Sequence, residues 1–533
     1  MRSVALDERR EAITRLAHQH FDLLVIGGGI TGVGVAQDAA ARGLKVALVE
    51  RGDYAIGTSS RSSKLIHGGL RYLAQGDFRV TYDSCAERAL LQRLAPHLVH
   101  SLAFLVPVYR WAYALQLVTG LWLYDFISKL QNTRFHKRVG ISRAQQLAPL
   151  LDTEGLISGY IYYDCQTNDA RLVMEVLKSA ASYGAVSANY LEVVELIKET
   201  GQVKGACARD LITEELIEIR AQVVLNATGV WMDGLRQVDD PNATRKVRPA
   251  KGVHIVIARD RIPTETALLF ESAARDGRSL FFIPWYEGTI IGTTDTDFQG
   301  DIDVPRASEE DIDYILAAVN RIFPAARLNA NDILSTYAGL RPLIDEGGKS
   351  TKDISREHRT FQSRSGLISI AGGKLTTYRR MAREVVDLIL TRLKALGQAV
   401  PNNPSRTDKI YLSGLDADTS LEVLVSQICA RAMRVGLDEK VAKHLVADYG
   451  VNSHEVIAIV EAKPILKAYL LPHLPFIEAE VIYAVRQEQA TRVEDFLVRR
   501  TRIALLAQDQ GMLCVPRVAW LMGQILNWRE EQI

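Results

Sequence analysis

Cysteine is scarce in this chain, and its spacing carries no pattern. The 533 residues include five cysteines, and no two of them form a C-x-x-C pair. An odd number of scattered cysteines in a chain this long is typical of a reducing compartment and offers no disulfide framework. Zinc ligands at the usual spacing are also missing. The sequence therefore argues against a disulfide-stabilised secreted domain and against a structural metal site.

An excess of charge of either sign is missing as well. Lysine and arginine together number 64, aspartate and glutamate 63, and the formal net charge is +1. Such a chain has no overall field to attract nucleic acid, so any anion must be bound by a local group of cations. We therefore expect no nucleic-acid partner. The length itself predicts two or three domains, because 533 residues exceed one ordinary core.

Long apolar runs are few. Residues 1–20 lack the apolar core of a secretory signal, and the spacing of Leu6, Ile13 and Leu16 predicts a short helical extension there. We therefore expect a cytoplasmic protein. The most apolar segment, Trp111–Ser128, is only marginally long enough to span a bilayer.

Two interpretations of residues 111–128 stay open. One is a helix buried in the core. The other is a helix lying in a membrane surface, because its tryptophans and tyrosines favour that zone and basic residues follow it. Those basic residues are Lys129, Arg134, His136, Lys137 and Arg138.

A glycine-rich turn near the start of the chain is the first positive signal. The apolar run Leu23–Ile26 is typical of a buried parallel strand. Gly27, Gly29 and Gly32 then give G-x-G-x-x-G before a helix, whose free N–H groups can bind a pyrophosphate. Glu50 ends the next strand, where an acid accepts hydrogen bonds from a ribose 2′-OH. The stretch predicts a dinucleotide site and leaves NAD and FAD open.

The connection after Glu50 is long, polar and rich in glycine. Connections of that length are usually functional, with a solvated surface loop as the alternative. This connection supplies serine hydroxyls and flexible backbone, at Ser59, Ser60, Ser62, Ser63 and His67-Gly68-Gly69. Two later apolar strands end in glycines in the same way, at Gly229 and at Gly372-Gly373. We expect these turns to bring backbone against a ligand.

The last quarter of the chain reads as a separate unit. Residues 398–408, QAVPNNPSRTD, are predicted to be a linker. Apolar residues at helical spacing follow and predict an α-helical domain over 409–533. The sequence leaves open whether this domain supports a homodimer or covers a membrane-facing side.

Eight motifs in this order and spacing resemble the FAD-dependent, quinone-linked glycerol-3-phosphate dehydrogenase family. They are VIGGGITGVGVAQDAAARGLKVALVE, TSSRSSKLIHGGLRYL, NATGVW, KGVHIV, IPW, IIGTTD, GLRPL and AGGKLTTYR. The resemblance runs from about Phe21 to Leu396, and the helical tail also looks like that family's C-terminal domain. The element SSKLIHGGLRYL is far more specific than the nucleotide turn.

The resemblance implies an α/β fold in three parts. These are a Rossmann-like FAD domain of the glutathione-reductase and D-amino-acid-oxidase type, a substrate domain with a mixed or antiparallel sheet, and a C-terminal all-α domain. The expected boundaries are 21–100, 155–235 and 335–397 for the FAD domain, and 101–154 and 236–334 for the substrate domain, with a membrane-surface segment at 111–128.

The same resemblance implies an activity. With FAD as cofactor, sn-glycerol 3-phosphate is oxidised to dihydroxyacetone phosphate, and electrons pass to a quinone in the membrane. The protein would then lie peripherally on the inner face of the cytoplasmic membrane. An oxygen-using oxidase of the same fold is the alternative, because the substrate motifs would be shared.

Cations and a base are the protein groups that this reaction needs. Arginine binds the oxygens of a phosphomonoester bidentately. The family match assigns phosphate binding to Arg71, Tyr72, Arg356, Lys374 and Thr376. Arg341 is almost always protonated, so we expect it to stabilise charge developing on the substrate oxygen. His254 is the expected proton acceptor, with orientation of the hydroxyl as the alternative role.

Cofactor contacts are also carried over from the resemblance. They fall on Gly27, Gly29, Gly32, Glu50, Ser59, Ser63, His67, Gly68, Gly229, Gly372 and Gly373. A helix that begins near Leu375 would place its positive end beside the flavin and stabilise the reduced, anionic form.

Overall fold

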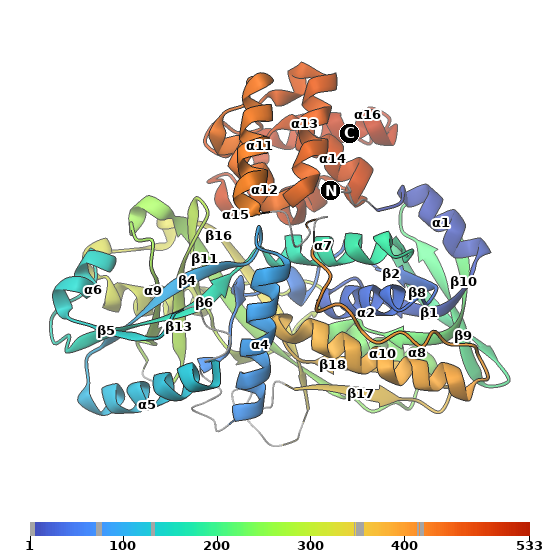
Figure 1. Cartoon of the computed structure of the whole chain (residues 1–533), viewed down its shortest axis with the longest axis horizontal. Coiled ribbons are helices and arrows are strands. Elements are labelled where there is room, and N and C mark those ends of the chain that lie inside the picture. Colours follow the sequence, from blue (N-terminus) through green and yellow to red (C-terminus); the bar gives the residue numbers. More distant parts are fainter. Residues whose placement is uncertain are drawn as a thin grey trace.

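Three bodies make up the protein in the computed structural model (Figure 1). The structure describes residues 6–70, 77–128, 134–274, 276–345, 347, 357–412, 415 and 420–533. Two sheet domains lie side by side, and a helical domain that carries the C-terminus sits across their top in Figure 1.

The first domain is a parallel sheet whose strands end at the same edge. Strand β1 lies between β10 and β2, and Ile26 is in register with Asn226 on one side and Val49 on the other. Strand β18 continues the parallel order, and β17 adds an antiparallel edge. The strands are β1 His20–Ile26, β2 Val46–Val49, β7 Val186–Ala188, β8 Leu191–Glu199, β9 Gln202–Asp210, β10 Leu216–Asn226, β17 His358–Gln362 and β18 Ile368–Gly372.

Each face of this sheet is covered. One face packs on α2, α7 and α10, and the other on the β8–β9 hairpin and α1. Because both faces are buried, β2 is apolar at every position rather than alternating. The helices are α1 Arg9–His18, α2 Ile30–Ala41, α7 Asp169–Ser182, α8 Met232–Asp239 and α10 Tyr378–Ala395.

The second domain is a mixed sheet. Strands β11 and β16 form a long antiparallel pair, and β4 pairs with β6 over its whole length. Its described strands are β3 Leu65–Ile66, β4 His100–Val108, β5 Lys137–Val139, β6 Ser158–Gln166, β11 Val247–Ala258, β12 Ala267–Glu271, β13 Ser279–Trp285, β14 Gly288–Gly292, β15 Thr296–Asp297 and β16 Ile333–Ile344. The helices beside it are α4 Phe78–Leu94, α5 Trp111–Ser128, α6 Ile141–Leu147 and α9 Glu309–Ile322.

Three parts of the predicted FAD domain differ from the structure. The prediction assigns residues 65–66, 155–166 and 335–344 to that domain, but β3, β6 and β16 are strands of the second sheet. Their places are decided by hydrogen bonding of β3 to β6, of β6 to β4 and of β16 to β11, all far apart in the sequence. The mixed sheet and the α/β fold class are as predicted.

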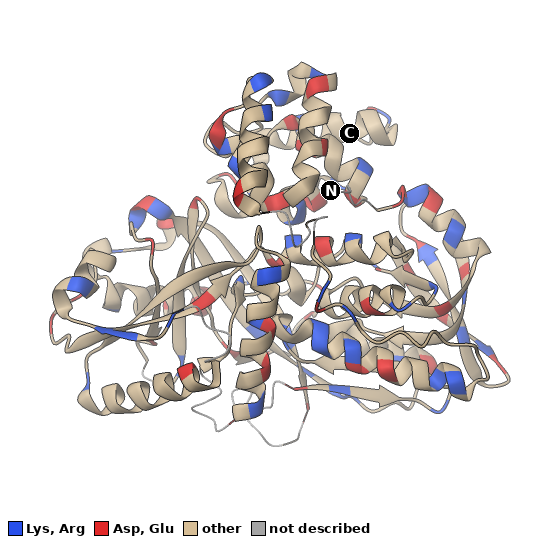
Figure 2. Ribbon diagram, viewed as in Figure 1, with Lys and Arg blue, Asp and Glu red and all other residues tan. Residues whose placement is uncertain are grey.

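Helix α5 is buried on one side only. Leu117, Leu121 and Tyr124 pack inward, whereas Trp111 and Phe126 are more than two-thirds exposed. Figure 2 shows this helix almost bare of charge. The fully buried interpretation of residues 111–128 is therefore wrong. Among the described residues, no helix is both long and apolar enough to cross a membrane.

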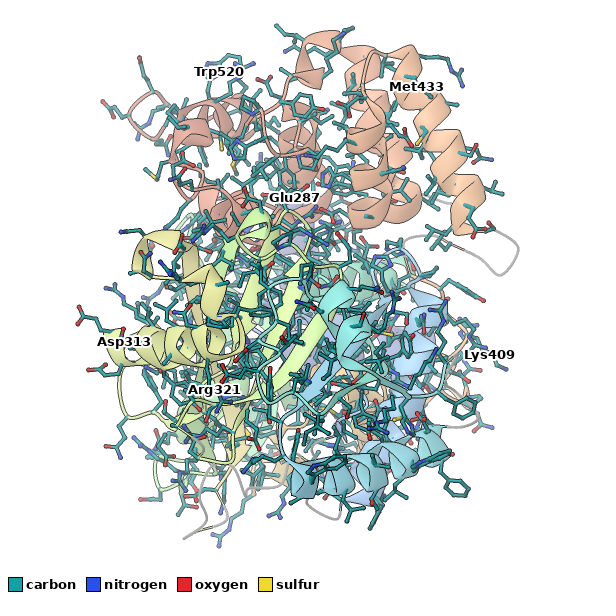
Figure 3. The ribbon with its side chains drawn as sticks, turned by 90° about the vertical axis from the view of Figure 1, so that its left-hand side faces the viewer. Glu287, Asp313, Arg321, Lys409, Met433 and Trp520 are labelled. Atoms are coloured by element: carbon teal, nitrogen blue, oxygen red, sulfur yellow. The ribbon has the colours of Figure 1, made fainter. Side chains whose placement is uncertain are left out.

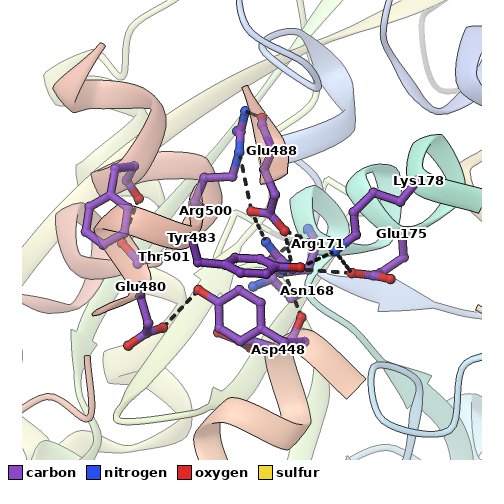
Figure 4. Close-up of polar contacts among 12 residues, drawn as sticks. Asn168, Arg171, Glu175, Lys178, Asp448, Glu480, Tyr483, Glu488, Arg500 and Thr501 are labelled. Carbon is purple, nitrogen blue, oxygen red and sulfur yellow. Dashed lines mark hydrogen bonds and ion pairs between the residues drawn. The ribbon is translucent and has the colours of Figure 1, made fainter. Parts of the chain in front are cut away.

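The helical domain packs on both sheet domains. In the side view of Figure 3, Glu287 lies where it meets the second sheet. Its contact with the first domain is a buried ion network, in which Arg171 of α7 donates to Glu488 at 2.8 and 2.9 Å (Figure 4). The elements are α11 Leu421–Arg434, α12 Glu439–Tyr449, α13 Ser453–Ala462, α14 Glu478–Glu488, a π-helical segment Asp495–Arg500, α15 Ile503–Leu506 and α16 Val515–Leu526.

Candidate active site

A cavity of about 1650 Å³ lies between the two sheets and reaches helix α5. Its walls include the glycine turn after β1, the loop after β2, the ends of β10 and β18, and one side of α5. Ordinary small-ligand pockets hold about 300–1,000 Å³, so this one has room for a dinucleotide together with a substrate.

The glycine turn is shaped for a pyrophosphate. Gly27 has φ +117, and a Cβ there would lie 2.6 Å from the carbonyl oxygen of Ala227. A Cβ at Gly32 would overlap the carbonyl oxygen of Gly27, so the turn and α2 pack together only with glycine. Helix α2 begins at Ile30, and its first N–H donates to Ser59 Oγ at 2.9 Å. Gly27, Gly29 and Ser59 all line the cavity, as a bound pyrophosphate would require.

Glu50 lies where the sequence predicts it, at the end of β2 and on the cavity wall. Its Oε2 accepts from the N–H of Gly28 at 2.6 Å, and its Oε1 accepts from the N–H of Gly52 at 2.9 Å. Burial raises the pKa of this carboxyl, and the two N–H groups act against that rise. Glu50 thus ties the turn after β1 to the loop after β2, and its contact with a ribose stays a prediction.

The HGG turn rests on a buried polar cluster. Gly68 N–H donates to Asp164 at 2.9 Å, and Asp164 is ion-paired with Arg88. Gly68 does not line the cavity among the described residues, whereas its neighbours His67 and Gly69 do. Burial lowers the pKa of His67 to about 4, so its imidazole is neutral at ordinary pH. The turn therefore presents a neutral ring and bare backbone to the cavity.

Thr376 has a different place from the one predicted. Its hydroxyl accepts from the N–H of His67 at 3.3 Å and lies 3.5 Å from the carbonyl oxygen of the same residue. The side chain is buried, and Thr376 is not among the described residues that line the cavity. In this structure the Thr376 hydroxyl holds the HGG turn in place, and its contact with a substrate phosphate stays a prediction.

Three glycines complete the wall for a cofactor. Gly229 and Gly372 have φ +61 and +82, and Gly373 has φ +79. All three line the cavity, at the ends of β10 and β18. A single helical turn, Leu375–Thr377, then leads into α10. The predicted helix start beside these glycines is thus present, and its action on a flavin stays a prediction.

Arg341 and Lys374 bring positive charge into the same cavity. Arg341, on β16, lies 3.3 Å from Asp295 and 3.3 Å from Thr293 Oγ1. Its guanidinium fits because Gly252 has no side chain: a Cβ there would lie 2.6 Å from Nη2. Lys374 Nζ is 3.3 Å from Ser84 Oγ. Arg71, Tyr72 and Arg356, which were predicted to add to this group, lie outside the described residues.

His254 is buried behind Ser63. Its Nε2 lies 2.8 Å from Ser63 Oγ, and its ring stacks on Tyr337 with centroids 4.7 Å apart. Ser63 lines the cavity, but His254 is not among the described residues that do. Burial, then Arg341 and Lys64, lower the pKa of His254 well below its usual value. The imidazole is therefore neutral and reaches the cavity through the serine hydroxyl.

Lys64 is a site residue that the sequence did not point to. It is buried, has φ +57, and its Nζ lies 2.6 Å from Asp169 Oδ1. The same ammonium donates to the carbonyl oxygen of Ser60 at 2.6 Å. A lysine in a polar run reads as a surface charge, and its partner is 105 positions away, so no local signal marks it.

Family models match both parts of the chain. One described as FAD dependent oxidoreductase matches residues 22–379, and one described as the C-terminal domain of alpha-glycerophosphate oxidase matches residues 405–533. The glycine turns, Glu50 and the large cavity fit FAD. The fold and the site thus define an FAD-dependent oxidoreductase.

Relatives that match nearly the whole of this chain identify the family within this class of oxidoreductases. Glycerol-3-phosphate dehydrogenase, mitochondrial, of Homo sapiens is 41% identical over 542 residues, which are 96% of this chain and 72% of that protein. Glycerol-3-phosphate dehydrogenase 2 of Mycobacterium tuberculosis is 40% identical over 530 residues, 99% of this chain and 88% of that one. A glycerol-3-phosphate dehydrogenase of Bacillus halodurans, solved with FAD, has a TM-score of 0.83 and 36% identity over 99% of this chain and 95% of that one. The chain belongs to the FAD-dependent glycerol-3-phosphate dehydrogenase family.

Proposed function

We propose that this protein oxidises sn-glycerol 3-phosphate to dihydroxyacetone phosphate. The observation that carries the proposal is that Arg341 and Lys374 line the same cavity as the dinucleotide turn. A phosphomonoester carries nearly two negative charges, and fixed cations in a low-dielectric site bind it strongly. The full-length relatives carry the name of this reaction's enzyme.

FAD, when bound, accepts the hydride; the chain's own residues bind and orient the substrate and take its proton. Lys374 binds the phosphate in this proposal, and the predicted contacts of Arg71, Tyr72 and Arg356 would add to it. Arg341 stabilises negative charge on the substrate oxygen as the hydroxyl loses its proton, because its guanidinium stays protonated. His254 is the base.

We further propose that electrons leave to a quinone at the cytoplasmic surface of a membrane. Tyr113, Leu117 and Leu123 of α5 line the cavity, while Trp111 and Phe126 of the same helix are exposed. A helix with aromatic residues outward and few charges suits the interface of a bilayer. It would place an apolar acceptor next to the same cavity.

A second candidate acceptor is molecular oxygen. The observation that favours it is the match of residues 405–533 to the C-terminal domain of alpha-glycerophosphate oxidase. An oxidase would use the same substrate groups and would release peroxide. The two candidates therefore differ in what reoxidises the flavin and agree in how the substrate reduces it.

One experiment tests the proposal and separates the acceptors. The purified holoenzyme is mixed with glycerol 3-phosphate under strict anaerobiosis, and the visible absorbance of the flavin is followed. We expect rapid bleaching, then recovery of colour on adding a short-chain quinone. If the absorbance of the bleached flavin recovers quickly with oxygen alone and peroxide forms, oxygen and not a quinone is the electron acceptor. Absence of bleaching would refute the proposal that glycerol 3-phosphate is the substrate.

A further inference from the structure

The proposed reaction needs a path for the proton of the substrate hydroxyl, and the base of that reaction lies behind another residue. His254 is 2% exposed and is not among the described residues that line the cavity. Ser63 does line it, and Ser63 Oγ lies 2.8 Å from His254 Nε2. A group in the cavity therefore meets the serine hydroxyl before it meets the imidazole.

We propose that Ser63 relays the proton of the substrate hydroxyl to His254. This inference rests on the proposed function and adds a relay residue to it. The substrate oxygen gives its proton to Ser63 Oγ, and Ser63 gives its own hydroxyl proton to His254 Nε2. FAD, when bound, would take the hydride from the carbon that bears this hydroxyl, and the electron pair of the broken O–H bond would become the second bond of the ketone. Serine ends the step as it began, and His254 ends it protonated.

The imidazole is held so that only Nε2 can take part. One ring face stacks on Tyr337 with an interplanar angle of 13°. A Cβ at Gly292 would lie 2.5 Å from Cδ2 of His254, so that position tolerates no side chain. Nδ1 has no hydrogen-bond partner among the described atoms, and it carries the proton when Nε2 accepts from Ser63.

The backbone on the other side of Ser63 is equally fixed. Lys64 has φ +57, a conformation that side-chain-bearing residues rarely adopt. Its ammonium is pinned between Asp169 and the carbonyl oxygen of Ser60, each at 2.6 Å. Ser62 Oγ donates to Asp169 at 2.7 Å. Strain held by several buried contacts is typical of a positioned functional group.

The pairing also separates Ser63 from the cofactor role predicted for it. Ser59 is the serine whose hydroxyl meets the N-terminus of α2, at 2.9 Å from Ile30 N. Ser63 is instead committed to His254. The two serines are four positions apart in one loop, yet their hydroxyls meet different partners.

The test is the anaerobic rate of flavin reduction by glycerol 3-phosphate in the full-length holoenzyme. We expect Ser63→Ala to lower this rate about 100-fold or more, because proton transfer by a positioned group contributes about 10²–10⁴. FAD affinity should stay within about threefold of the parent. Ser63→Thr keeps the hydroxyl and should restore most of the rate. The matched control is Ser335→Ala, which removes a buried hydroxyl on β16 that donates to Leu505 O of α15; its rate should equal that of the parent.

A double variant checks that the two residues act in one path. If they do, Ser63→Ala combined with His254→Asn should be no slower than the slower single variant. Multiplied losses would overturn the relay. So would an unchanged rate in Ser63→Ala, or a loss of FAD affinity with a parental rate in the FAD-bound fraction. Bleaching of the flavin in the parent enzyme tests the proposed function alone. If the parent does not bleach, both that function and the relay are refuted. If Ser63→Ala is reduced as fast as the parent, only the relay is refuted.

Discussion

Arg500 and Asp53 form a fully buried ion pair between the C-terminal domain and the cofactor domain. Arg500 Nη2 lies 2.7 Å from Asp53 Oδ1 and Arg500 Nη1 2.8 Å from Asp53 Oδ2. Asp53 belongs to the loop between Glu50 and Ser59, which forms a wall of the cavity. Arg499 also donates to Asp53, at 2.5 Å. The helical domain thus holds the loop that follows Glu50, the acid predicted to bind a ribose.

Asp53→Asn should therefore lower the stability of the fold and weaken the binding of FAD. It leaves two buried guanidinium groups facing a neutral amide, and breaking a buried pair costs about 3–5 kcal/mol. We expect a lower free energy of unfolding by about that amount and faster release of FAD. Chemical denaturation and the fluorescence of released flavin measure the two effects.

Asp313→Asn is the control for that change. Asp313 is exposed on α9, at the surface in Figure 3, so its neutralisation should change stability by less than about 0.5 kcal/mol. Equal losses in the two variants would contradict the structural role of the Asp53 pair.

The same interface predicts sensitivity to acid. Burial opposes the charge of Glu488, but Arg171 and Lys178 hold its pKa at about 2, below the ordinary 4.5. A depressed carboxyl pKa stabilises the fold above pH 4.5, and this stabilisation is lost as pH falls from 4.5 towards 2. The shift corresponds to about 3 kcal/mol. Unfolding curves at pH 6, 4 and 3 should show the loss, and a Glu488→Gln variant, less stable at pH 6, should show a smaller one.

Gly252→Ala should impair the site and spare the fold. The new Cβ would meet the guanidinium of Arg341 at 2.6 Å and Thr293 Oγ1 at 2.7 Å, and both are side-chain atoms that can move aside. Displacing this cation should slow anaerobic flavin reduction about 10- to 100-fold, which is less than the loss of about 100- to 1,000-fold on removing such a group outright, because the guanidinium is moved and not deleted. FAD affinity should not change. Gly140→Ala, whose Cβ meets nothing within 4 Å, is the matched control; a parental rate in Gly252→Ala would argue against the role of Arg341.

Helix α5 predicts binding to a lipid surface. Trp111 and Phe126 are 71% and 73% exposed, and burying each in an interface contributes about 1.5–3 kcal/mol. Replacing both by serine should lower binding to anionic vesicles by more than tenfold in a flotation assay. Flavin reduction by soluble substrate should persist. Trp520→Ser, on α16 of the helical domain, should bind like the parent; equal binding by the α5 variant would remove this surface from the proposal.

The sequence by itself determined the class of site. Gly27, Gly32 and Glu50 indicate a dinucleotide site because the requirements of such a site lie close together in the sequence. These requirements are a sharp turn, a helix packed close to it and an acid at the end of the next strand. The order of the longer motifs pointed to the family in the same way. Local residues that act on a shared ligand leave a local pattern, which can be read without a structure.

Tertiary structure alone decided how the groups meet. Ser63 and His254 are 191 positions apart, and Asp53 and Arg500 are 447 apart. Nothing near Thr376 in the sequence says that its hydroxyl accepts from the N–H of His67, 309 positions away. Strands β6 and β16 joined the second sheet through partners far along the chain. Hydrogen bonds and ion pairs of this kind depend on which faces pack together, and packing is settled only when the whole chain has folded.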